Sequence, residues 1–208
     1  SWCPEKPVDP RPGLISSGGG LEYPLSLIAK ATILDSDAMR RIVRRMAGEI
    51  LESERDLAEL MLIGIRTRGV PLAEQLAAEI LAQEGRAPAI GTLDITLYRD
   101  DLSLVAPKPV VRESHFPAPI EGRTLVLCDD VLYTGRTVRA ALDALLDFGR
   151  PKAVRLAVLI DRGWRELPIH ADYVGRKVPT SASEVIKVSF EESDGAAEVQ
   201  ILDRKPDA

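Results

Sequence analysis

The residues best suited to chemistry lie in one stretch, residues 125–137, which reads Leu-Val-Leu-Cys-Asp-Asp-Val-Leu-Tyr-Thr-Gly-Arg-Thr. An apolar run typical of a buried strand stops at Asp129 and Asp130, and a small-residue turn then leads into a helix. Backbone N–H groups at the positive end of a helix bind phosphate. Adjacent carboxylates suit sugar hydroxyls or a hydrated divalent cation. The stretch therefore predicts a site for a phosphorylated sugar.

Other phosphate motifs do not fit this chain. The sequence contains neither the Gly-x-x-x-x-Gly-Lys-Ser/Thr pattern of a P-loop nor the Gly-x-Gly-x-x-Gly pattern of a dinucleotide site. An isolated Asp-Asp pair is more often a polar strand end that caps a turn than a binding site. The prediction therefore depends on the whole order of strand, carboxylates, turn and helix.

The full stretch resembles the phosphoribosyl pyrophosphate (PRPP) signature of type I phosphoribosyltransferases, with Cys128 at a position that is usually aliphatic. Four other segments are similar to the PyrR family of pyrimidine operon regulators, which are also uracil phosphoribosyltransferases. They read IGIRTRGVPL at 63–72, LDITLYRDDL at 93–102, DRGWRELP at 161–168 and ADYVGRKVPTS at 171–181. The similarity covers roughly residues 31–202, nearly the whole chain.

The resemblance implies how each part of the site acts. The carboxylates of Asp129 and Asp130 would hold the ribose hydroxyls or the Mg²⁺ bound there, and one of them could instead transfer a proton. The phosphate loop would bind the 5′-phosphate of PRPP; it consists of Val131, Leu132, Tyr133, Thr134, Gly135, Arg136 and Thr137. A second turn would face the pyrophosphate, and family members commonly have a non-proline cis peptide there. It consists of Arg66, Thr67, Arg68 and Gly69.

Two further segments are expected to complete the site. Residues 98–122 have no helical or strand periodicity, and a connection of this length is typically a binding loop or lid. Arg99, near its start, is a candidate catalytic contact to pyrophosphate when the lid closes and excludes water, the alternative being a solvated charge cluster. The resemblance places base recognition in a hood at about 161–183. The candidates there are Arg162 and the backbone of Val178, with Tyr173 as either a base contact or a core aromatic.

A cluster of arginines lies opposite the apolar stripe of the first predicted helix. Guanidinium groups can neutralise RNA phosphates and stack on bases, whereas nearby glutamates favour a solvated, internally paired face. The resemblance favours RNA binding. The arginines are Arg40, Arg41, Arg44 and Arg45, and the glutamates are Glu49, Glu52 and Glu54.

Three positions depart from the family pattern on the surface that the resemblance assigns to RNA. Trp164 and Gly48 stand where histidine is usual, and His170 stands where a basic residue is usual. Trp164 could still serve as a stacking surface. Because of these departures, a second hypothesis stays open, in which the chain has retained catalysis and lost regulation.

The resemblance implies a uridine-nucleotide-dependent RNA-binding regulator of pyrimidine biosynthesis genes that also converts uracil and PRPP into UMP and pyrophosphate. Mg²⁺ is the implied cofactor; PRPP, uracil, UMP or UTP and the leader RNA of pyrimidine genes are the implied partners. The alternative is a uracil salvage enzyme without RNA binding. A third hypothesis, the same fold acting on a purine base, is disfavoured by the continuous match over residues 161–181.

Composition is consistent with a cytoplasmic, globular protein. The chain has 208 residues, 45% of them hydrophobic and 28% charged, which is ordinary globular usage. The net charge of −5 argues against general coating of nucleic acid but allows a local basic face. Cys3 and Cys128 make no disulfide framework, which favours a reducing compartment. We find no secretory signal pattern and no apolar run near the roughly 20 residues of a membrane span.

The chain divides into a tail and one domain. Residues 1–24 are rich in Pro, Gly and Ser and predict a disordered tail, so a single domain is expected over residues 25–208. An exposed apolar helix stripe and a C-terminal hairpin leave surfaces to cover, which favours a homodimer or homotetramer.

Hydrophobic periodicity predicts the elements that position these residues. Helices are expected from Ser36, from Pro71 and after Thr137, the last closed by Gly149 and Pro151. Strands are expected at 60–65, through Leu93, Ile95 and Leu97, at 125–130 and at 154–160, followed by a hairpin that begins at Glu184 and turns at 193–195. This order predicts an α/β fold: an open, mainly parallel sheet flanked by helices, with a small C-terminal hood or hairpin. Ligands of such sheets bind beyond the carboxyl ends of the strands, where the motifs above begin.

Overall fold

A five-stranded parallel sheet forms the centre of the protein in a computed structural model that describes residues 25–99 and 113–206. Its strand order is β3-β2-β4-β5-β6, and every neighbouring pair is parallel. The strands are β2 (Leu60–Ile65), β3 (Ala89–Leu93), β4 (Thr124–Leu132), β5 (Ala153–Asp161) and β6 (Tyr173–Lys177). The predicted α/β class is therefore confirmed.

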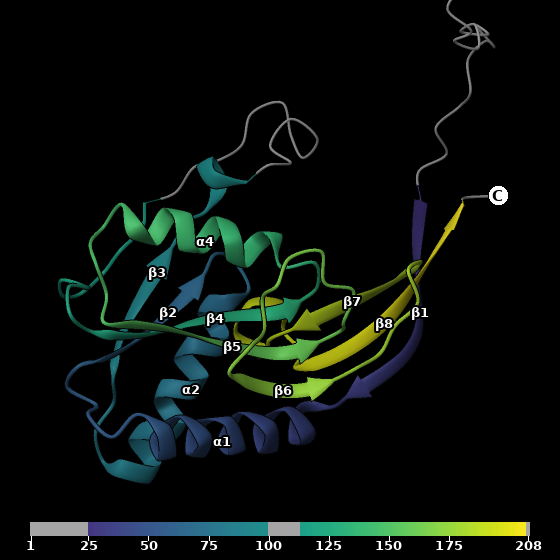
Figure 1. Ribbon diagram of the computed structural model, residues 1–208. Helices are drawn as coiled ribbons and strands as arrows, with labels where there is room; N and C mark the ends of the chain where they lie inside the picture. Colours follow the sequence, from purple (N-terminus) through teal and green to yellow (C-terminus); the bar gives the residue numbers. More distant parts are fainter. Residues whose placement is uncertain (1–24, 100–112, 207–208) are drawn as a thin grey trace, which may run out of the picture.

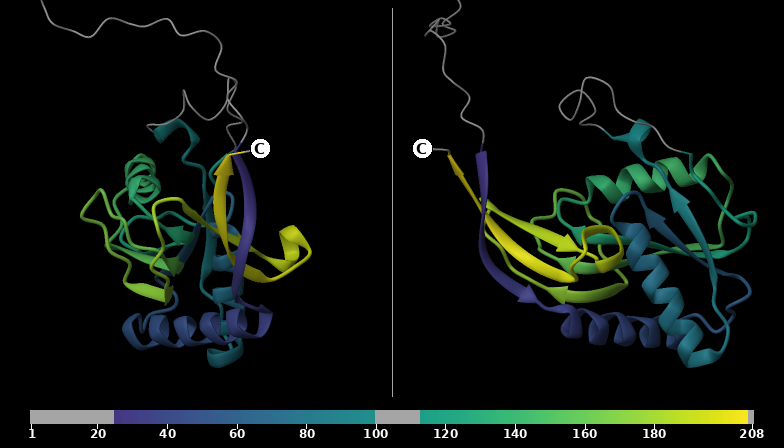
Figure 2. Two further views of the ribbon diagram at one scale, coloured as in Figure 1. Left: turned by 90° about the vertical axis from the view of Figure 1, so that its right-hand side faces the viewer. Right: turned by 180° about the vertical axis from the view of Figure 1, so that it is seen from behind.

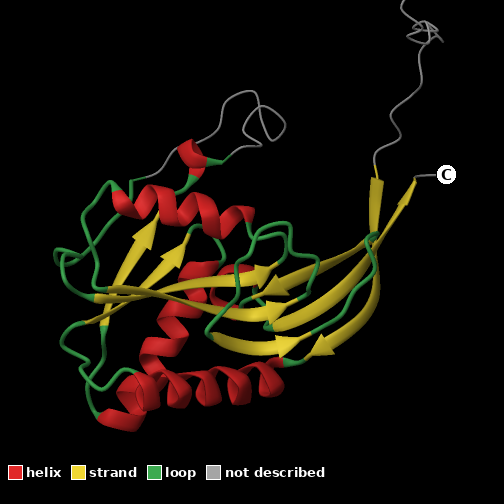
Figure 3. Cartoon of the chain, in the orientation of Figure 1, coloured by secondary structure: helices red, strands yellow, loops and turns green. Residues whose placement is uncertain are grey.

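Helices cover both faces of this sheet (Figure 1; Figure 3). Helices α1 (Ser36–Ser53) and α2 (Gly69–Glu84) pack on one face, and α4 (Arg136–Leu146) packs on the other. Because the central strands are buried on both sides, β2 is apolar and buried along its whole length. Asp35 caps α1 by accepting a hydrogen bond from the Ala38 N–H at 2.7 Å.

A second, three-stranded antiparallel sheet stands beside the parallel one, with the order β1-β8-β7. Its strands are β1 (Leu25–Leu34), β7 (Glu184–Ser189) and β8 (Glu198–Pro206), and the short helix α5 (Glu191–Asp194) joins β7 to β8. In Figure 2, β1 and β8 run side by side beyond the end of the parallel sheet. The predicted hairpin is present, and β1, which no sequence pattern indicated, completes its sheet by pairing with β8.

Two strand ends differ from the predictions. The strand predicted through Leu93, Ile95 and Leu97 ends at Leu93, so the prediction is wrong beyond that residue. The Asp94 carboxylate accepts hydrogen bonds from the Thr96 N–H (2.8 Å) and hydroxyl (2.5 Å), and these bonds start a 3₁₀ turn, η1 (Thr96–Tyr98). Strand β4 does not stop at Asp130 but continues to Leu132, because it keeps pairing with β5.

The helix boundaries differ by a few residues. Helix α2 begins at Gly69, two residues before Pro71, and α4 ends at Leu146, before Gly149. The predicted tail, residues 1–24, and most of the predicted lid lie outside the described residues. Within the described ranges, the helices are too short or too polar to cross a membrane.

Candidate active site

The candidate residues that follow β2, β4 and β5 meet at one edge of the parallel sheet, because parallel strands point their carboxyl ends the same way. The turn at 66–69 follows β2, the phosphate loop follows the two aspartates of β4, and residues 162–169 follow β5. Segments separated by about a hundred residues in the chain thus become neighbours.

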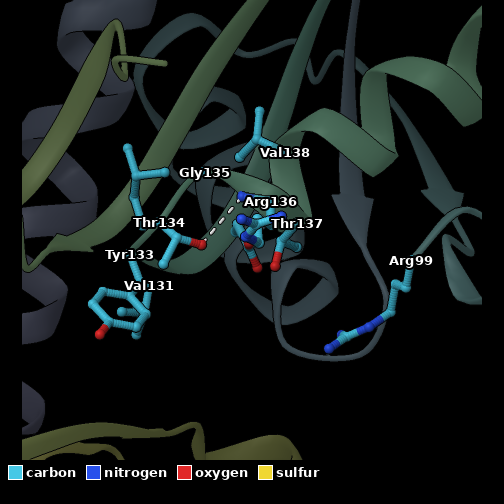
Figure 4. Close-up of a pocket in the computed structure, with 10 residues that line it drawn as sticks. Arg99, Val131, Tyr133, Thr134, Gly135, Arg136, Thr137 and Val138 are labelled. Carbon is cyan, nitrogen blue, oxygen red and sulfur yellow. Dashed lines mark hydrogen bonds between the residues drawn. The ribbon is translucent and has the colours of Figure 1, made fainter. Parts of the chain in front are cut away.

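The phosphate loop lines a pocket of about 290 Å³ together with Arg99 and Asp129 (Figure 4). Gly135 precedes α4 with φ of 93°, a left-handed conformation that favours glycine. The Thr134 hydroxyl accepts a hydrogen bond from the Arg136 N–H at 3.3 Å, and this bond tightens the turn. The N-terminus of α4 therefore opens into the pocket with its positive end, as phosphate binding requires.

Arg99 reaches this pocket from the end of β3 (Figure 4). The η1 turn before it is docked on α4, because the Tyr98 hydroxyl bonds the Asp147 carboxylate and the Tyr98 carbonyl accepts from Arg139 Nη2 at 3.4 Å. These two contacts place Arg99 beside the phosphate loop although it is exposed to solvent.

The side chains of Asp129 and Asp130 leave the backbone toward opposite faces of the sheet, since side chains alternate along a strand. Asp129 continues the series of Leu125 and Leu127, which belong to the core on the α4 side. Asp130 continues the series of Val126 and Cys128, which belong to the core on the side of α1 and α2. The pair is therefore placed between the phosphate loop on one side and the 66–69 turn on the other.

The protein environment opposes the negative charge of both aspartates. Burial raises the pKa of Asp129 well above its usual value, repulsion from Asp130 adds to this, and the positive charge of Arg99 acts in the opposite direction. Burial also raises the pKa of Asp130, while the Val131 N–H, which donates to Asp130 at 2.9 Å, and the charge of Arg68 lower it. Raised carboxyl pKa values of this kind are common at functional sites.

A stability measurement follows from these pKa values. Asp129→Asn is expected to raise the melting temperature at pH 8, by about 3 °C for each 1 kcal/mol of stability gained in a chain of this size. A carboxyl pKa raised in the folded state means that wild-type stability is fully present at acidic pH and decreases as pH rises through that pKa. Urea unfolding of both proteins at pH 8 and pH 5 should show the difference shrinking at pH 5. A constant or reversed difference would contradict the buried-charge explanation.

The 66–69 turn packs tightly against the end of β4. Its Arg66–Thr67 peptide bond is cis, as the family resemblance implied. A Cβ atom on Gly69 would lie 2.0 Å from the Cys128 carbonyl oxygen, so only glycine allows this approach. Arg66 Nη2 donates to the Thr92 hydroxyl at 3.1 Å, whereas its Nε is buried and finds no acceptor among the described residues. An orphaned buried donor in this turn is a group that an anionic ligand can satisfy.

A hollow of about 500 Å³ adjoins this turn. Its lining consists of Arg66, Thr67, Arg68, Val70 and Pro71 from the turn and the start of α2, with Ser193 and Asp194 from α5. Helix α5 thus contributes to the wall of this hollow, although it lies more than 120 residues from the turn in the sequence.

The candidate base contacts have different surroundings. Arg162 is only 6% exposed; its Nη2 donates to the Glu184 carbonyl at 2.8 Å, and its guanidinium lies 4.0 Å from the ring centre of Tyr133. The Val178 N–H donates to the Asp161 carbonyl at 2.8 Å and is therefore already engaged within the protein. Tyr173 is a core residue, 6% exposed, with its hydroxyl 2.5 Å from Ser53 Oγ.

A pocket of about 360 Å³ lies beside Arg162 and is lined by Asp161, Gly163, Trp164, Lys177, Val178, Pro179 and Thr180 as well. Because Arg162 also stacks on Tyr133, which lines the phosphate pocket, one pair of side chains forms a wall between the two hollows.

Arg165 organises the loop after β5 and was not predicted. Its guanidinium pairs with Asp161 at 2.5 Å and donates to the carbonyls of Tyr133 (2.7 Å), Gly163 (2.9 Å) and Ile169 (3.0 Å). These bonds hold the phosphate loop against residues 161–169. The sequence offers no signal for this role, since the Tyr133 carbonyl is 32 residues away in the chain and meets Arg165 only in the fold.

The donor set at the β4 end fits a magnesium ion only in part. Among the described residues, we find no group of three or more His, Cys, Asp or Glu side chains able to enclose a metal. Mg²⁺ commonly binds through one or two carboxylates plus substrate phosphates and water. Asp129 and Asp130 therefore fit an ion whose remaining ligands come from a bound phosphorylated sugar.

All four arginines of the predicted RNA surface are exposed on α1, opposite its buried stripe. Arg40 pairs with Asp37, and Arg45 pairs with Glu49 while donating to the carbonyls of Val174 (3.0 Å) and Gly175 (2.5 Å). A hollow of about 410 Å³ between α1 and β6 is lined in part by Arg41, Arg45 and Arg176. Internal pairing and a concentrated positive surface thus coexist on this face.

Comparison with known proteins shows close relatives. Residues 29–193 match the family model described as "Phosphoribosyl transferase domain". The chain is 58% identical over 174 residues to "Bifunctional protein PyrR" of Pelotomaculum thermopropionicum, covering 84% of this chain and 96% of the relative. It is 53% identical over 176 residues to the protein of the same name from Thermus thermophilus, covering 85% and 97% of the two chains.

Solved structures share the fold at lower identity. A hypoxanthine-guanine phosphoribosyltransferase from Bacillus anthracis superposes with a TM-score of 0.62 at 18% identity, covering 85% of this chain and 99% of that one. The hypoxanthine phosphoribosyltransferase of Trypanosoma cruzi gives 0.64 at 15% identity, covering 85% and 98%. The architecture of two packed sheets is therefore that of phosphoribosyltransferases.

Proposed function

Because the chain belongs to the PyrR family of phosphoribosyltransferases, we propose that it is a uridine-nucleotide-dependent, RNA-binding regulator of pyrimidine biosynthesis genes that also makes UMP from uracil and PRPP. One observation carries the enzymatic half. The phosphate loop, Asp129 and Arg99 line a single pocket, and the cis-peptide turn lies beside the same strand end. This arrangement provides separate places for the two ends of PRPP.

In the proposed reaction, the bond between C1 of the ribose and pyrophosphate breaks as a ring nitrogen of uracil bonds to C1, through a cation-like sugar. The proton of that nitrogen is given up to the departing pyrophosphate or to one of the two β4 aspartates. The N–H groups of residues 134–137 hold the 5′-phosphate, and Arg66, Arg99 and the 66–69 turn receive the pyrophosphate. Mg²⁺, held with PRPP by Asp129 and Asp130, would neutralise charge on the departing group. The rate enhancement then comes from placement and charge stabilisation.

We assign the uracil ring to the side of the pocket formed by Val178 and Arg162. The Val178 carbonyl can accept a hydrogen bond from a ring N–H. Arg162 shapes this wall, because its bonds to Thr180 (3.0 Å) and to the Glu184 carbonyl hold it against Tyr133.

The regulatory half of the proposal rests on the exposed arginines of α1, which would contact phosphates of the leader RNA. UMP or UTP bound in the catalytic pocket would favour the RNA-binding form if it binds that form more tightly. The proposal includes a cytoplasmic homo-oligomer, for which exposed Leu27 and Ile28 on β1 provide apolar surface. In this proposal, residues 25–208 form one domain, with the lid at about 98–122 and the hood at about 161–183.

A salvage enzyme without RNA binding is the second candidate. Trp164, His170 and Gly48 favour it, since they replace residues usual in the family. In the structure, Trp164 is 52% exposed and its indole Nε1 donates to the Thr180 carbonyl at 2.7 Å. The indole ring is thus held at one edge and exposes surface on which an RNA base can stack. For this reason we prefer the RNA-binding regulator to the salvage enzyme.

Two assays on one preparation separate these functions. UMP formation from uracil and PRPP is expected, with hypoxanthine in place of uracil giving no product. Binding to the leader RNA of its own pyrimidine genes is expected to tighten with UMP and to weaken with salt, by roughly 0.7–0.9 log units in affinity per log unit of salt for each phosphate contacted. UMP formation without specific RNA binding would support the salvage enzyme instead of the regulator. Absence of both activities would refute the proposal.

A further inference from the structure

The 66–69 turn is tied by an ion pair to α5, the short helix between β7 and β8. Arg68 Nη1 bonds the carboxylate of Asp194 in α5 and lies 3.5 Å from Ser193 Oγ. The two partners are 126 residues apart in the chain. The short helix between β7 and β8 therefore reaches into the part of the site that the proposed function assigns to the leaving group.

Asp194 is held in place by its own surroundings. Its Oδ2 accepts hydrogen bonds from the Phe190 N–H (2.9 Å) and the Ser193 hydroxyl (2.8 Å), and its own N–H donates to the Phe190 carbonyl (2.8 Å). The Phe190 side chain is completely buried in the core. The bond to Arg68 first, and the Phe190 N–H next, hold the pKa of Asp194 well below its usual value. The carboxylate is thus a charged, fixed anchor.

The anchored arginine lines the hollow beside the 66–69 turn. Arg66, Thr67 and Asp194 line the same hollow, so the guanidinium is held at the place that the proposed function assigns to pyrophosphate. A guanidinium carries five N–H donors, and the Asp194 bond engages donors of one terminal nitrogen. Fixing a long side chain in advance reduces the rotamer entropy lost when it binds an anion.

The geometry points to Asp194 as a positioning residue of the phosphoribosyl-transfer site, which orients Arg68 for the pyrophosphate group of PRPP. The inference rests on the proposed function. The Arg68–Asp194 ion pair is exposed and therefore adds little to the stability of the fold. Its effect is expected to be on the position of the Arg68 guanidinium. Asp194 touches Arg68 and not the reacting atoms, and its contribution should be confined to ligands that carry pyrophosphate.

The test is Asp194→Asn, in which the amide oxygen can still accept from Phe190 and Ser193 while the negative charge on Arg68 is lost. We expect the KM for PRPP to rise three- to tenfold, with kcat and the KM for uracil within twofold of wild type. Inhibition by added pyrophosphate should weaken by a similar factor. Glu192→Gln is the matched control: it removes the same charge from the same short helix but contacts Gln75 instead, at 3.3 Å.

A double-mutant cycle separates positioning from a fold defect. If Asp194 acts through Arg68, Asp194→Asn should change nothing further in an Arg68→Ala background, whereas damage to α5 would persist there. Three results would overturn the inference: Asp194→Asn kinetics equal to those of Glu192→Gln, a lower KM for PRPP, or an undiminished effect without Arg68. Failure of wild type to make UMP would instead refute the proposed function.

Discussion

Asp130→Asn is expected to lower UMP formation by about 10³-fold, within the range of roughly 10²–10⁴ that one positioned acid–base or electrostatic group supplies. The proposed transition state places positive charge on the sugar and loosens the bond to pyrophosphate. A carboxylate fixed beside the ribose stabilises that charge, and an amide does not. The fold should persist, because the amide oxygen of Asn can still accept from the Val131 N–H.

The measurement is steady-state turnover with saturating uracil and PRPP, checked against the thermal melt of the same sample. Asp56→Asn is the matched control, since Asp56 is exposed and also accepts a backbone hydrogen bond, from Ala58 at 3.0 Å, but precedes β2 at the opposite edge of the sheet. Turnover of Asp130→Asn within tenfold of wild type would show that Asp129 alone carries the proposed role.

Arg44→Glu combined with Arg45→Glu is expected to weaken leader-RNA binding at least about 100-fold at low salt, because two phosphate contacts become repulsive. The slope of log affinity against log salt should fall by roughly 1.4–1.8, which is two contacts at 0.7–0.9 each. Both side chains are exposed, and Arg45 lies beside Arg176 in the hollow between α1 and β6. UMP formation should be unchanged, since neither residue lines the phosphate or pyrophosphate pockets.

The control for this charge reversal is Arg150→Glu with Lys152→Glu. It makes the same change in net charge on exposed residues in the turn before β5, away from α1. If both double variants weaken RNA binding equally, overall charge and not the α1 surface governs binding. An unchanged salt slope in the α1 variant would move the RNA site to another face.

The two aspartates proposed to act in the reaction are expected to lower the stability of the fold at the end of β4. Two carboxylates are kept partly or fully buried next to each other, and burial raises the pKa of each. Arg99 approaches one of them and Arg68 the other, so positive charge from two loops compensates part of this burial. Site residues held in unfavourable surroundings are expected where function sets the sequence.

Motifs with a local physical meaning could be predicted well from the chain. The strand at residues 60–65 is as predicted, the strand predicted at 154–160 extends by one residue at each end, and α1 begins at Ser36. The parallel arrangement followed from the alternation of strands and helices. The phosphate loop, the cis-peptide turn and their place at one sheet edge followed from the same reasoning together with the family resemblance.

Predictions failed or stayed open where a side-chain contact, and not the hydrophobic pattern, decided the structure. Asp94 ends β3 by bonding Thr96, which hydrophobic alternation through Ile95 and Leu97 conceals. Tyr173 had two interpretations that no pattern could separate, and its burial against Ser53 decides for the core.

The sequence by itself determined the order of strand, carboxylates, turn and helix that predicts a phosphorylated-sugar site, and the family resemblance added the pyrophosphate turn, because both depend on short segments read in order. Only the tertiary structure decided which distant groups contact these segments: Asp194 contacts Arg68, and Arg165 contacts the carbonyl of Tyr133 in the phosphate loop. The reason is physical. A phosphate loop is specified by local backbone geometry, whereas an ion pair or a carbonyl contact across more than thirty residues exists only after packing has brought its partners together.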